Sequence, residues 1–252
     1  MKKMHKYLVT AVFSSLCGVA GATPIFSVTY EAAGVTNSTA AFATKGIETF
    51  NNKGAGLNQT FTSTFGMSGV NAITGTYKNV DIAAQNLYGG ADGSYALTST
   101  NTASSATYSL SLSSAQPITY FGYWLSALDA GNQLSFYKGN DLLFSFTPDA
   151  VLSLTGNCTT AGNAYCGNPK TGENKGQSYV FLNFFDQDAS GFDRIVFNET
   201  VAYSGFESDN HTVGRFVTTS GTELNKVPEP GTLALLGLGV LGLARARKRK
   251  KL

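Results

Sequence analysis

Residues 134–146 read LSFYKGNDLLFSF. On both sides of Gly139-Asn140, apolar side chains recur at every second position, at Leu134, Phe136, Leu142, Phe144 and Phe146. In an extended strand, a period of two places such side chains on one face. Gly and Asn tolerate the positive φ angles of a two-residue hairpin turn. The segment therefore predicts an antiparallel β-hairpin with one apolar face.

The rest of residues 23–218 has the same character. Short β-branched or aromatic runs alternate with Gly, Ser, Thr and Asn about every ten positions. This pattern predicts an all-β domain, a β-sandwich or jelly-roll-like fold, over 23–218. The predicted strands cover 25–30, 57–65, 72–77, 106–114, 117–126, 133–138, 141–146, 178–185, 193–197, 201–209 and 212–218. We also expect a short helical turn at 147–154, loops at 89–94 and 167–177, and a polar linker at 219–227.

The amino-terminal residues 1–22 have the parts of a signal peptide. Three lysines precede an apolar run that begins at Leu8, and the small residues Ala20-Gly21-Ala22 end it. The run is too short to be a good permanent membrane span. We therefore expect cleavage between Ala22 and Thr23 and export of the mature chain. A buried N-terminal strand or helix is the alternative.

The carboxyl end has three parts in a fixed order. Pro228-Glu229-Pro230 comes first, followed by the uncharged residues 231–244, GTLALLGLGVLGLA, and by the basic residues 245–252. A fourteen-residue helix is about 21 Å long, which is short against a hydrocarbon core of about 30 Å. The basic residues would stay cytoplasmic under the positive-inside rule. The segment predicts a weak transmembrane anchor with the body of the protein outside.

This order of motif, apolar helix and basic end resembles the PEP-CTERM sorting signal of exosortase substrates in Gram-negative bacteria. The resemblance implies that the precursor is anchored transiently in the inner membrane. It also implies that an exosortase-type enzyme cuts the chain near Pro228, Glu229 and Pro230. The product would then reach the cell surface or the extracellular space. A plain, lasting C-terminal anchor is the alternative.

Between Thr23 and Lys226 the chain is acidic. This part contains nine Lys and Arg residues against fifteen Asp and Glu, a net charge of about −6, whereas the basic residues of the two ends bring the whole chain to +2. An acidic body repels polyphosphate. We therefore expect no nucleic-acid partner.

Two cysteines, Cys158 and Cys166, remain after removal of the signal peptide. An even pair eight positions apart in an exported chain predicts a disulfide that closes a Gly- and Asn-rich loop. Zinc is the alternative, but two thiols with no neighbouring histidine make a poor zinc site.

The stretch DQDASG places oxygen donors at Asp186, Asp188 and Ser190, followed by a glycine. This spacing matches the first half of a calcium loop. The second half departs from it, because Phe197 stands where a helical calcium hand needs a bidentate glutamate. Calcium in a loop between strands and a solvated acidic turn are the two alternatives. No other cofactor is expected.

Trp124 is the only tryptophan, and it lies in the aromatic run YFGYWLS. Aromatic rings on a sheet surface can stack on sugar rings. Large aromatic residues are more often found in the core between strands. Trp124 is therefore a candidate either for glycan contact or for the core.

The central residues carry a second resemblance. The segments YFGYWLSALDAGNQLSFYKGNDLLFSF, YVFLNFFDQDASGFDRIVF and SGFESDNHTVG are similar to a family of exosortase-dependent surface proteins. They also resemble carbohydrate-binding and lectin-like β-sandwich modules, whose last strand often carries an acidic motif such as Glu207-Ser208-Asp209-Asn210. The resemblance implies the fold class more than a ligand.

Catalytic signals are weak. His211 is the only histidine outside the signal peptide, no nucleophile motif accompanies it, and we expect it to be exposed. Carboxylate pairs for glycoside hydrolysis are available from Asp186, Asp188, Asp193 and Glu199. The sequence therefore favours a non-catalytic surface or matrix protein that associates with exopolysaccharide. A secreted glycan hydrolase and a purely structural coat protein are the alternatives.

Overall fold

The computed structural model describes residues 26–69, 72–101, 105–155, 158 and 162–224. The predicted signal peptide at 1–22, its cleavage site, and the sorting tail with Pro228-Glu229-Pro230 lie outside the described residues. In the part of the chain that is described, no helix is both long enough and apolar enough to cross a membrane.

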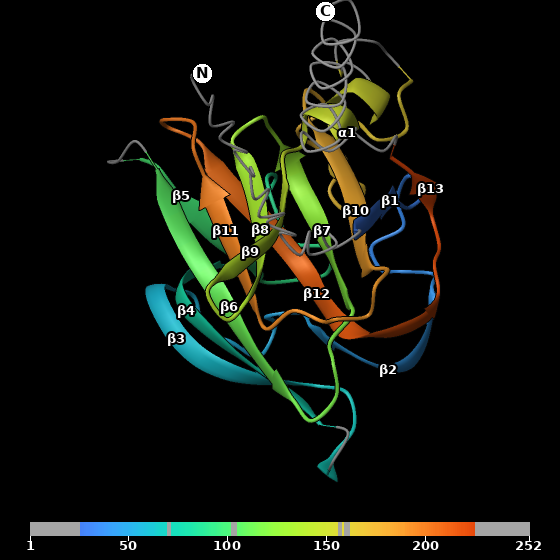
Figure 1. Cartoon of the computed structure of the whole chain (residues 1–252). Helices are drawn as coiled ribbons and strands as arrows, with labels where there is room; N and C mark the ends of the chain where they lie inside the picture. The colour runs from blue at the N-terminus through green and yellow to red at the C-terminus, as the bar shows by residue number, and fades with distance from the viewer. Residues whose placement is uncertain (1–25, 70–71, 102–104, 156–157, 159–161, 225–252) are drawn as a thin grey trace, which may run out of the picture.

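The described residues form thirteen strands and one short helix (Figure 1). The elements are β1 (Phe26–Tyr30), β2 (Ala41–Glu48), β3 (Gly56–Phe65), β4 (Ile73–Ala83), β5 (Tyr95–Ser99), β6 (Ala106–Ser114), β7 (Tyr120–Leu128), β8 (Asn132–Lys138), β9 (Asp141–Phe146), α1 (Asp149–Thr155), β10 (Ser178–Asp186), β11 (Arg194–Glu199), β12 (Gly205–Thr218) and β13 (Thr222–Glu223). The prediction of an all-β domain is confirmed.

The strands belong to one continuous antiparallel sheet, in the order β13-β1-β10-β7-β12-β5-β4-β6-β11-β8-β9. The long strand β12 is the central junction of the sheet. It pairs with β7 on one side, and on the other side with β5 through its first residues and with β2 through its later ones. The remaining strand, β3, pairs with β4.

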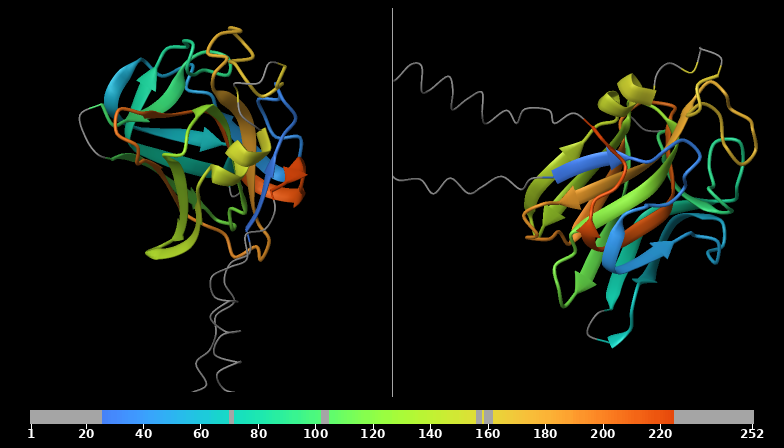
Figure 2. Two further views of the ribbon diagram at one scale, coloured as in Figure 1. Left: turned by 90° about the horizontal axis from the view of Figure 1, so that it is seen from above. Right: turned by 90° about the vertical axis from the view of Figure 1, so that its right-hand side faces the viewer.

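The sheet curls until its two ends face each other (Figures 1 and 2). Phe26 of β1 stacks on Phe144 of β9 with ring centroids 4.9 Å apart, and Phe184 of β10 lies 5.2 Å from Phe136 of β8. Aromatic pairs at such separations add to the stabilisation from apolar burial. A single aromatic core therefore joins the two halves of the sheet.

The neighbouring strands β7 and β10 are buried along their whole length. One face of each contributes to the main core, and the other is covered by two smaller apolar clusters. Burial on both faces explains why these strands read as near-continuous apolar runs.

The hairpin predicted at 134–146 is confirmed as β8 and β9, with Gly139 at a φ of 58° in the turn. A register shift between Phe136 and Tyr137 changes the alternation on β9. As a result, Leu142 is 56% exposed and does not share the buried face with Phe146. The helical turn predicted at 147–154 is confirmed as α1.

The predicted elements differ from the structure in several places. β2 was not predicted because half of its residues are exposed and it lacks an apolar alternation. β5 is only five residues long and follows the glycine-rich loop. β12 is one continuous strand through Asn210, where two strands were predicted. Asn210 has a φ of 49° and lies where the pairing of β12 with β7 is irregular. The predicted linker at 219–227 contains β13, which pairs with β1.

The backbones of β2 and β3 approach each other closely at Gly46. A Cβ added there would lie less than 3.0 Å from backbone atoms of Phe65 and Gly66, closer than real Cβ atoms come to their neighbours. Only a residue without a side chain fits this crossing.

Candidate functional site

A groove of about 420 Å³ opens where β5, the end of β7 and the start of β12 meet. Two exposed tyrosines, Tyr88 and Tyr203, and the carboxyl groups of Asp129 and Glu207 lie among its lining residues. Ligand sites in proteins have volumes of this order. The groove is therefore the candidate functional site.

The first side of the groove is the loop that carries Tyr88. Asn86 Oδ1 accepts hydrogen bonds from the backbone nitrogens of Tyr88 at 2.8 Å and Gly89 at 3.1 Å. The hydroxyl of Tyr179 donates to the carbonyl oxygen of Leu87 at 2.8 Å. Tyr88 is 49% exposed although the loop beneath it is held at several points.

The second side is the turn that carries Tyr203. This side chain is 85% exposed, and its φ is 62°. A positive φ is unusual for a bulky residue and persists only where the surroundings hold the backbone. Here the backbone nitrogen of Thr100 donates to the carbonyl oxygen of Ser204 at 3.0 Å, and Thr100 Oγ1 accepts from the Ser204 nitrogen at 3.0 Å. Ser204 Oγ also donates to Asp129.

The half-buried carboxyl group of Glu207 lines the groove, and the buried carboxyl group of Glu199 lies near it. Burial, followed by the nearby charges of Asp129 and Glu199, raises the pKa of Glu207 to about 8. Burial also raises the pKa of Glu199, whose Oε2 accepts from Asn132 Nδ2 at 2.8 Å. Glu207 is therefore mostly protonated at pH 7, and it can donate a hydrogen bond as well as accept one.

His211 is buried, so the prediction that it is exposed was wrong. Its Nδ1 lies 3.0 Å from the Tyr77 hydroxyl and its Nε2 lies 3.0 Å from Ser208 Oγ, which lies 2.7 Å from the Tyr108 hydroxyl. The ring stacks on Phe197 at 5.0 Å. Burial lowers the pKa of His211 to about 3. A neutral imidazole in the core of the sheet serves packing and hydrogen bonding.

The predicted calcium residues lie in one tight turn after β10. Asp186 Oδ2 accepts from the Gly191 nitrogen at 2.7 Å, and Asp188 Oδ1 accepts from the Ser190 nitrogen at 2.8 Å. Asp186 Oδ1 is buried without a hydrogen-bond partner among the described residues. Burial and then the adjoining Asp188 carboxyl raise the pKa of Asp186 to about 6, while the Asp186 carboxyl lowers the pKa of Asp188.

The donors available for a cation at this turn are few. The ammonium group of Lys138 donates to the carbonyl oxygen of Ser190 at 2.7 Å. Within the described ranges, no three His, Cys, Asp or Glu side chains are grouped so that they could hold a metal ion. Calcium takes six to eight oxygen ligands. Calcium binding at Asp186, Asp188 and Ser190 therefore stays a prediction.

The four carboxylates considered for hydrolysis do not share one cleft. Asp193 accepts from the Gly139 nitrogen beside the β8–β9 turn, whereas Glu199 lies at the other end of β11. Six residues of strand separate the two by about 20 Å. The carboxyl groups that the groove does bring together are Asp129 and Glu207.

Trp124 lies in the interior, which agrees with the alternative that it is a core residue and not a glycan contact. It is 1% exposed and packs with Tyr179, Phe181, Ala91 and Ala127. The indole is therefore not available to stack on a sugar from solvent.

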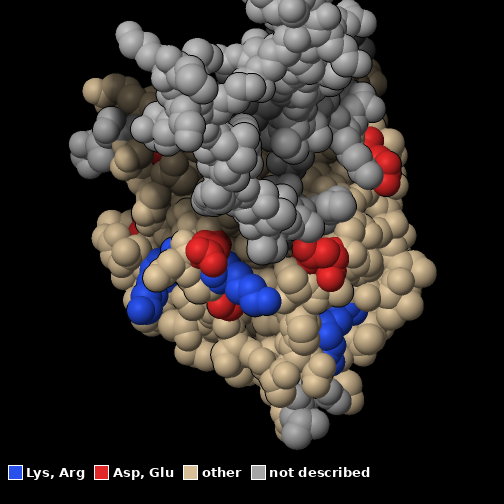
Figure 3. All heavy atoms as spheres, viewed as in Figure 1, with Lys and Arg blue, Asp and Glu red and all other residues tan. Residues whose placement is uncertain are grey.

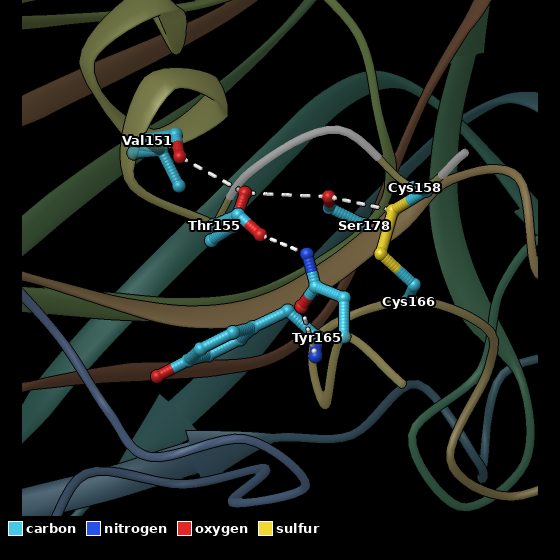
Figure 4. Close-up of a disulfide and its surroundings, with 7 residues drawn as sticks. Val151, Thr155, Cys158, Tyr165, Cys166 and Ser178 are labelled. Atoms are coloured by element: carbon cyan, nitrogen blue, oxygen red, sulfur yellow. Dashed lines mark hydrogen bonds between the residues drawn. A yellow bond between two sulfur atoms is a disulfide. The ribbon is translucent and has the colours of Figure 1, made fainter. Parts of the chain in front are cut away.

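The predicted disulfide between Cys158 and Cys166 is present and lies against the start of β10 (Figure 4). Ser178 Oγ lies 3.3 Å from Cys158 Sγ and 3.3 Å from Thr155 Oγ1, at the end of α1. The carbonyl oxygen of Tyr165, the residue before Cys166, accepts a hydrogen bond from the backbone nitrogen of Tyr179 at 2.9 Å. The disulfide thus joins the loop after α1 to the buried strand β10.

Loss of this disulfide will destabilise the protein. We expect the double variant Cys158→Ser/Cys166→Ser to lose about 2–3 kcal/mol in the free energy of unfolding, because the bond restricts the unfolded chain. Urea unfolding of both proteins measures the difference. A reductant should shift the wild-type midpoint and leave the variant unchanged; equal midpoints for the two oxidised proteins would contradict the prediction.

Sequence reasoning missed the groove itself. Tyr88 lies just before two glycines, and Tyr203 falls inside a predicted strand, so neither had a pattern that marks an exposed aromatic. Asp129 comes from the end of β7 and Glu207 from β12, which only the pairing of those strands brings together. An aromatic residue next to turn residues was the single signal available for Tyr88.

A comparison with protein-family models matches the end of the chain. The PEP-CTERM protein-sorting motif covers residues 226–250. No curated protein and no solved structure matches the chain. The match includes Pro228, Glu229 and Pro230, the apolar residues 231–244 and most of the basic end.

Proposed function

We propose that this chain, which carries a PEP-CTERM protein-sorting motif, is an exosortase-dependent exported protein that acts without catalysis at the cell surface or in the extracellular matrix. Its body would be a jelly-roll-like β-sandwich module that associates with exopolysaccharide. The observation that carries the proposal is the family match over residues 226–250.

The two ends of the chain support the route to the surface. A signal peptide over residues 1–22 would direct export, with cleavage between Ala22 and Thr23. Residues 231–244 would hold the precursor in the inner membrane while the basic residues 245–252 stay on the cytoplasmic side. An exosortase-type enzyme would then cut near Pro228-Glu229-Pro230 and release or attach the product.

The body suits an extracellular environment. The Cys158–Cys166 disulfide fits an oxidising compartment. The two exposed tyrosines of the groove offer an adhesive surface that catalysis does not require. Association with a hydrated polysaccharide needs exposed aromatic and polar groups, and the groove provides both.

The mass of the protein recovered from its native host tests the proposal. We expect a chain that begins at Thr23, ends near Pro228 to Pro230, and lacks the two hydrogens lost in the Cys158–Cys166 bond. Intact-mass spectrometry measures this. Substitution of Pro228, Glu229 and Pro230 by alanine should leave the tail attached. A wild-type chain that keeps residues 231–252 at full abundance would contradict processing and leave a membrane-tethered β domain.

A glycan hydrolase is the second candidate, and one observation favours it. Asp129 and Glu207 line one groove, and the pKa of Glu207 is raised to about 8, as in a general acid. Release of reducing ends from polysaccharide by the wild type, but not by Glu207→Gln, would support catalysis. A structural coat protein would instead associate with itself in the absence of any glycan.

A further inference from the structure

We infer that the groove between Tyr88 and Tyr203 is a binding site for a neutral polysaccharide chain. We call it the tyrosine groove, and we define it by Tyr88, Tyr203, Asp129, Gln177 and Glu207. The inference rests on the proposed function, in which the body contacts exopolysaccharide, and it adds the site and the chemical class of the ligand.

The exposed tyrosines are the first step of the argument. Large aromatic side chains are usually buried, and Tyr88 and Tyr203 are the exposed tyrosines of the described chain. Both line the same concavity, although they come from segments more than a hundred residues apart. The apolar face of a sugar ring packs on such a π surface.

The loops that carry these rings are the second step. Asn86 and Tyr179 hold the loop beneath Tyr88, and Thr100 and Ser204 hold the turn beneath Tyr203 through the hydrogen bonds described above. The positive φ of Tyr203 is maintained by these contacts. Rings on prearranged loops lose little freedom when a ligand binds, which favours affinity.

The polar lining is the third step. Gln177 Oε1 already accepts from Asn174 Nδ2 at 2.6 Å, so its NH₂ group remains as a donor, and Asn101 adds a second amide. The carboxyl groups of Asp129 and Glu207 accept hydrogen bonds from hydroxyl groups. A groove lined by two aromatic rings, two amides and two carboxyl groups can offer stacking to the apolar faces of a sugar chain and hydrogen bonds to its hydroxyl groups.

The charge of the groove selects the class of sugar. No Lys or Arg is found among the described residues that line it, and the chain between its two ends carries about −6. Outside the grey atoms, the surface visible in Figure 3 carries only small separate groups of acidic and basic side chains. An uronic-acid or sulfated polymer would meet the Asp129 carboxyl group and an acidic body, with no lysine or arginine in the described lining to balance its charge. A neutral polymer meets no such repulsion.

Affinity electrophoresis of the full-length chain in non-ionic detergent tests the inference. Native gels would contain dextran, galactomannan, arabinogalactan or alginate, each run once with calcium and once with a chelator. We expect retardation by at least one neutral polymer and none by alginate. The absence of retardation in all three neutral gels, or a stronger retardation in alginate, would overturn the inference.

Variants locate the site. Tyr88→Ala/Tyr203→Ala should weaken the retardation about tenfold or more, because it removes both aromatic stacking surfaces. Tyr203→Trp should retain binding, because stacking needs the ring and not the hydroxyl. Leu142→Ala is the matched control, as it removes an exposed apolar side chain on β9, outside the groove. A double tyrosine variant that is retarded like the wild type, and that has its melting temperature, would overturn the assignment.

This experiment separates the two proposals. Export and tail processing are read from the mass of the native protein, which no substitution in the tyrosine groove should alter. A correctly processed protein without glycan retardation would remove the groove and keep the sorting route. A retarded protein with an intact tail would keep the groove and remove the sorting route.

Discussion

Replacement of Gly46 by alanine will lower the free energy of unfolding by about 3 kcal/mol or more. The new Cβ would overlap backbone atoms of Phe65 and Gly66, and backbone cannot rotate out of the way as a flexible side chain can. Overpacking of this kind costs about 1–3 kcal/mol, and more where the main chain has to move. The strands β2 and β3 would separate. Val213 of β12, which pairs with Gly46 of β2, would then lose its place in the pairing of these two strands.

Chemical denaturation with urea measures this loss. Gly54→Ala is the matched control, because a Cβ at Gly54 meets nothing within 4 Å and its φ does not require glycine. That variant should remain within about 0.5 kcal/mol of the wild type. Equal stability of Gly46→Ala and Gly54→Ala would show that β2 does not cross β3 as closely as the structure indicates.

Between pH 5 and pH 8 the free energy of unfolding will fall by about 5 kcal/mol, because three carboxyl groups lose about 7 kcal/mol and one imidazole gains about 2 kcal/mol. Burial raises the pKa of Asp186 to about 6, of Asp209 to about 7 and of Glu207 to about 8. A carboxyl group whose folded-state pKa is raised contributes stability that is fully present below its unfolded pKa, near 4. That contribution is lost as the pH rises through the folded-state pKa. The three losses together span about pH 4 to 8.

His211 changes the free energy of unfolding in the opposite direction, so that its contribution grows as the pH rises. Its folded-state pKa is lowered to about 3, so its contribution is present above pH 6.5 and is lost as the pH falls. Three carboxyl groups outweigh one imidazole between pH 5 and pH 8, so the net change is a loss of stability with rising pH. Stability should therefore be greatest in mildly acidic solution.

Thermal unfolding at a series of pH values checks this. The melting temperature should be lower at pH 8 than at pH 5 by about 10–20 °C. Glu207→Gln should flatten the profile and raise stability at pH 8 by about 3 kcal/mol or more. Glu173→Gln, on an exposed loop, removes the same charge and should keep the wild-type slope. A profile that rises toward pH 8 would contradict the burial of these carboxyl groups.

The sequence predicted the elements that follow local rules. The hairpin of β8 and β9 has both the alternation and the glycine turn that define it, and the buried strands β7 and β10 are nearly unbroken apolar runs. β2 could not be found in this way, because its stability comes from pairing with β12 and not from its own side chains. β13 is two residues long and depends entirely on β1.

The groove and the histidine could not be predicted for the same reason. Burial of His211 follows from neighbours on four strands, Tyr77, Tyr108, Phe197 and Ser208, of which only Ser208 is near it in the chain. The groove arises where β5, β7 and β12 meet two loops. A pattern of residue types along the chain carries no information on which of these segments will be neighbours, whereas the sorting tail is contiguous and was recognisable from its order alone.

The position of β12 also determines the order in which this fold can be completed. A chain that emerges with its N-terminus first presents β2, β5 and β7 long before residues 205–218 arrive to pair with all three. Until then, three strand edges stay open at the middle of the sheet. Sheets built from such distant partners fold slowly, and their unpaired edges are prone to aggregation. A chain interrupted before Gly205 would therefore lack the centre of its sheet and not merely its last strand.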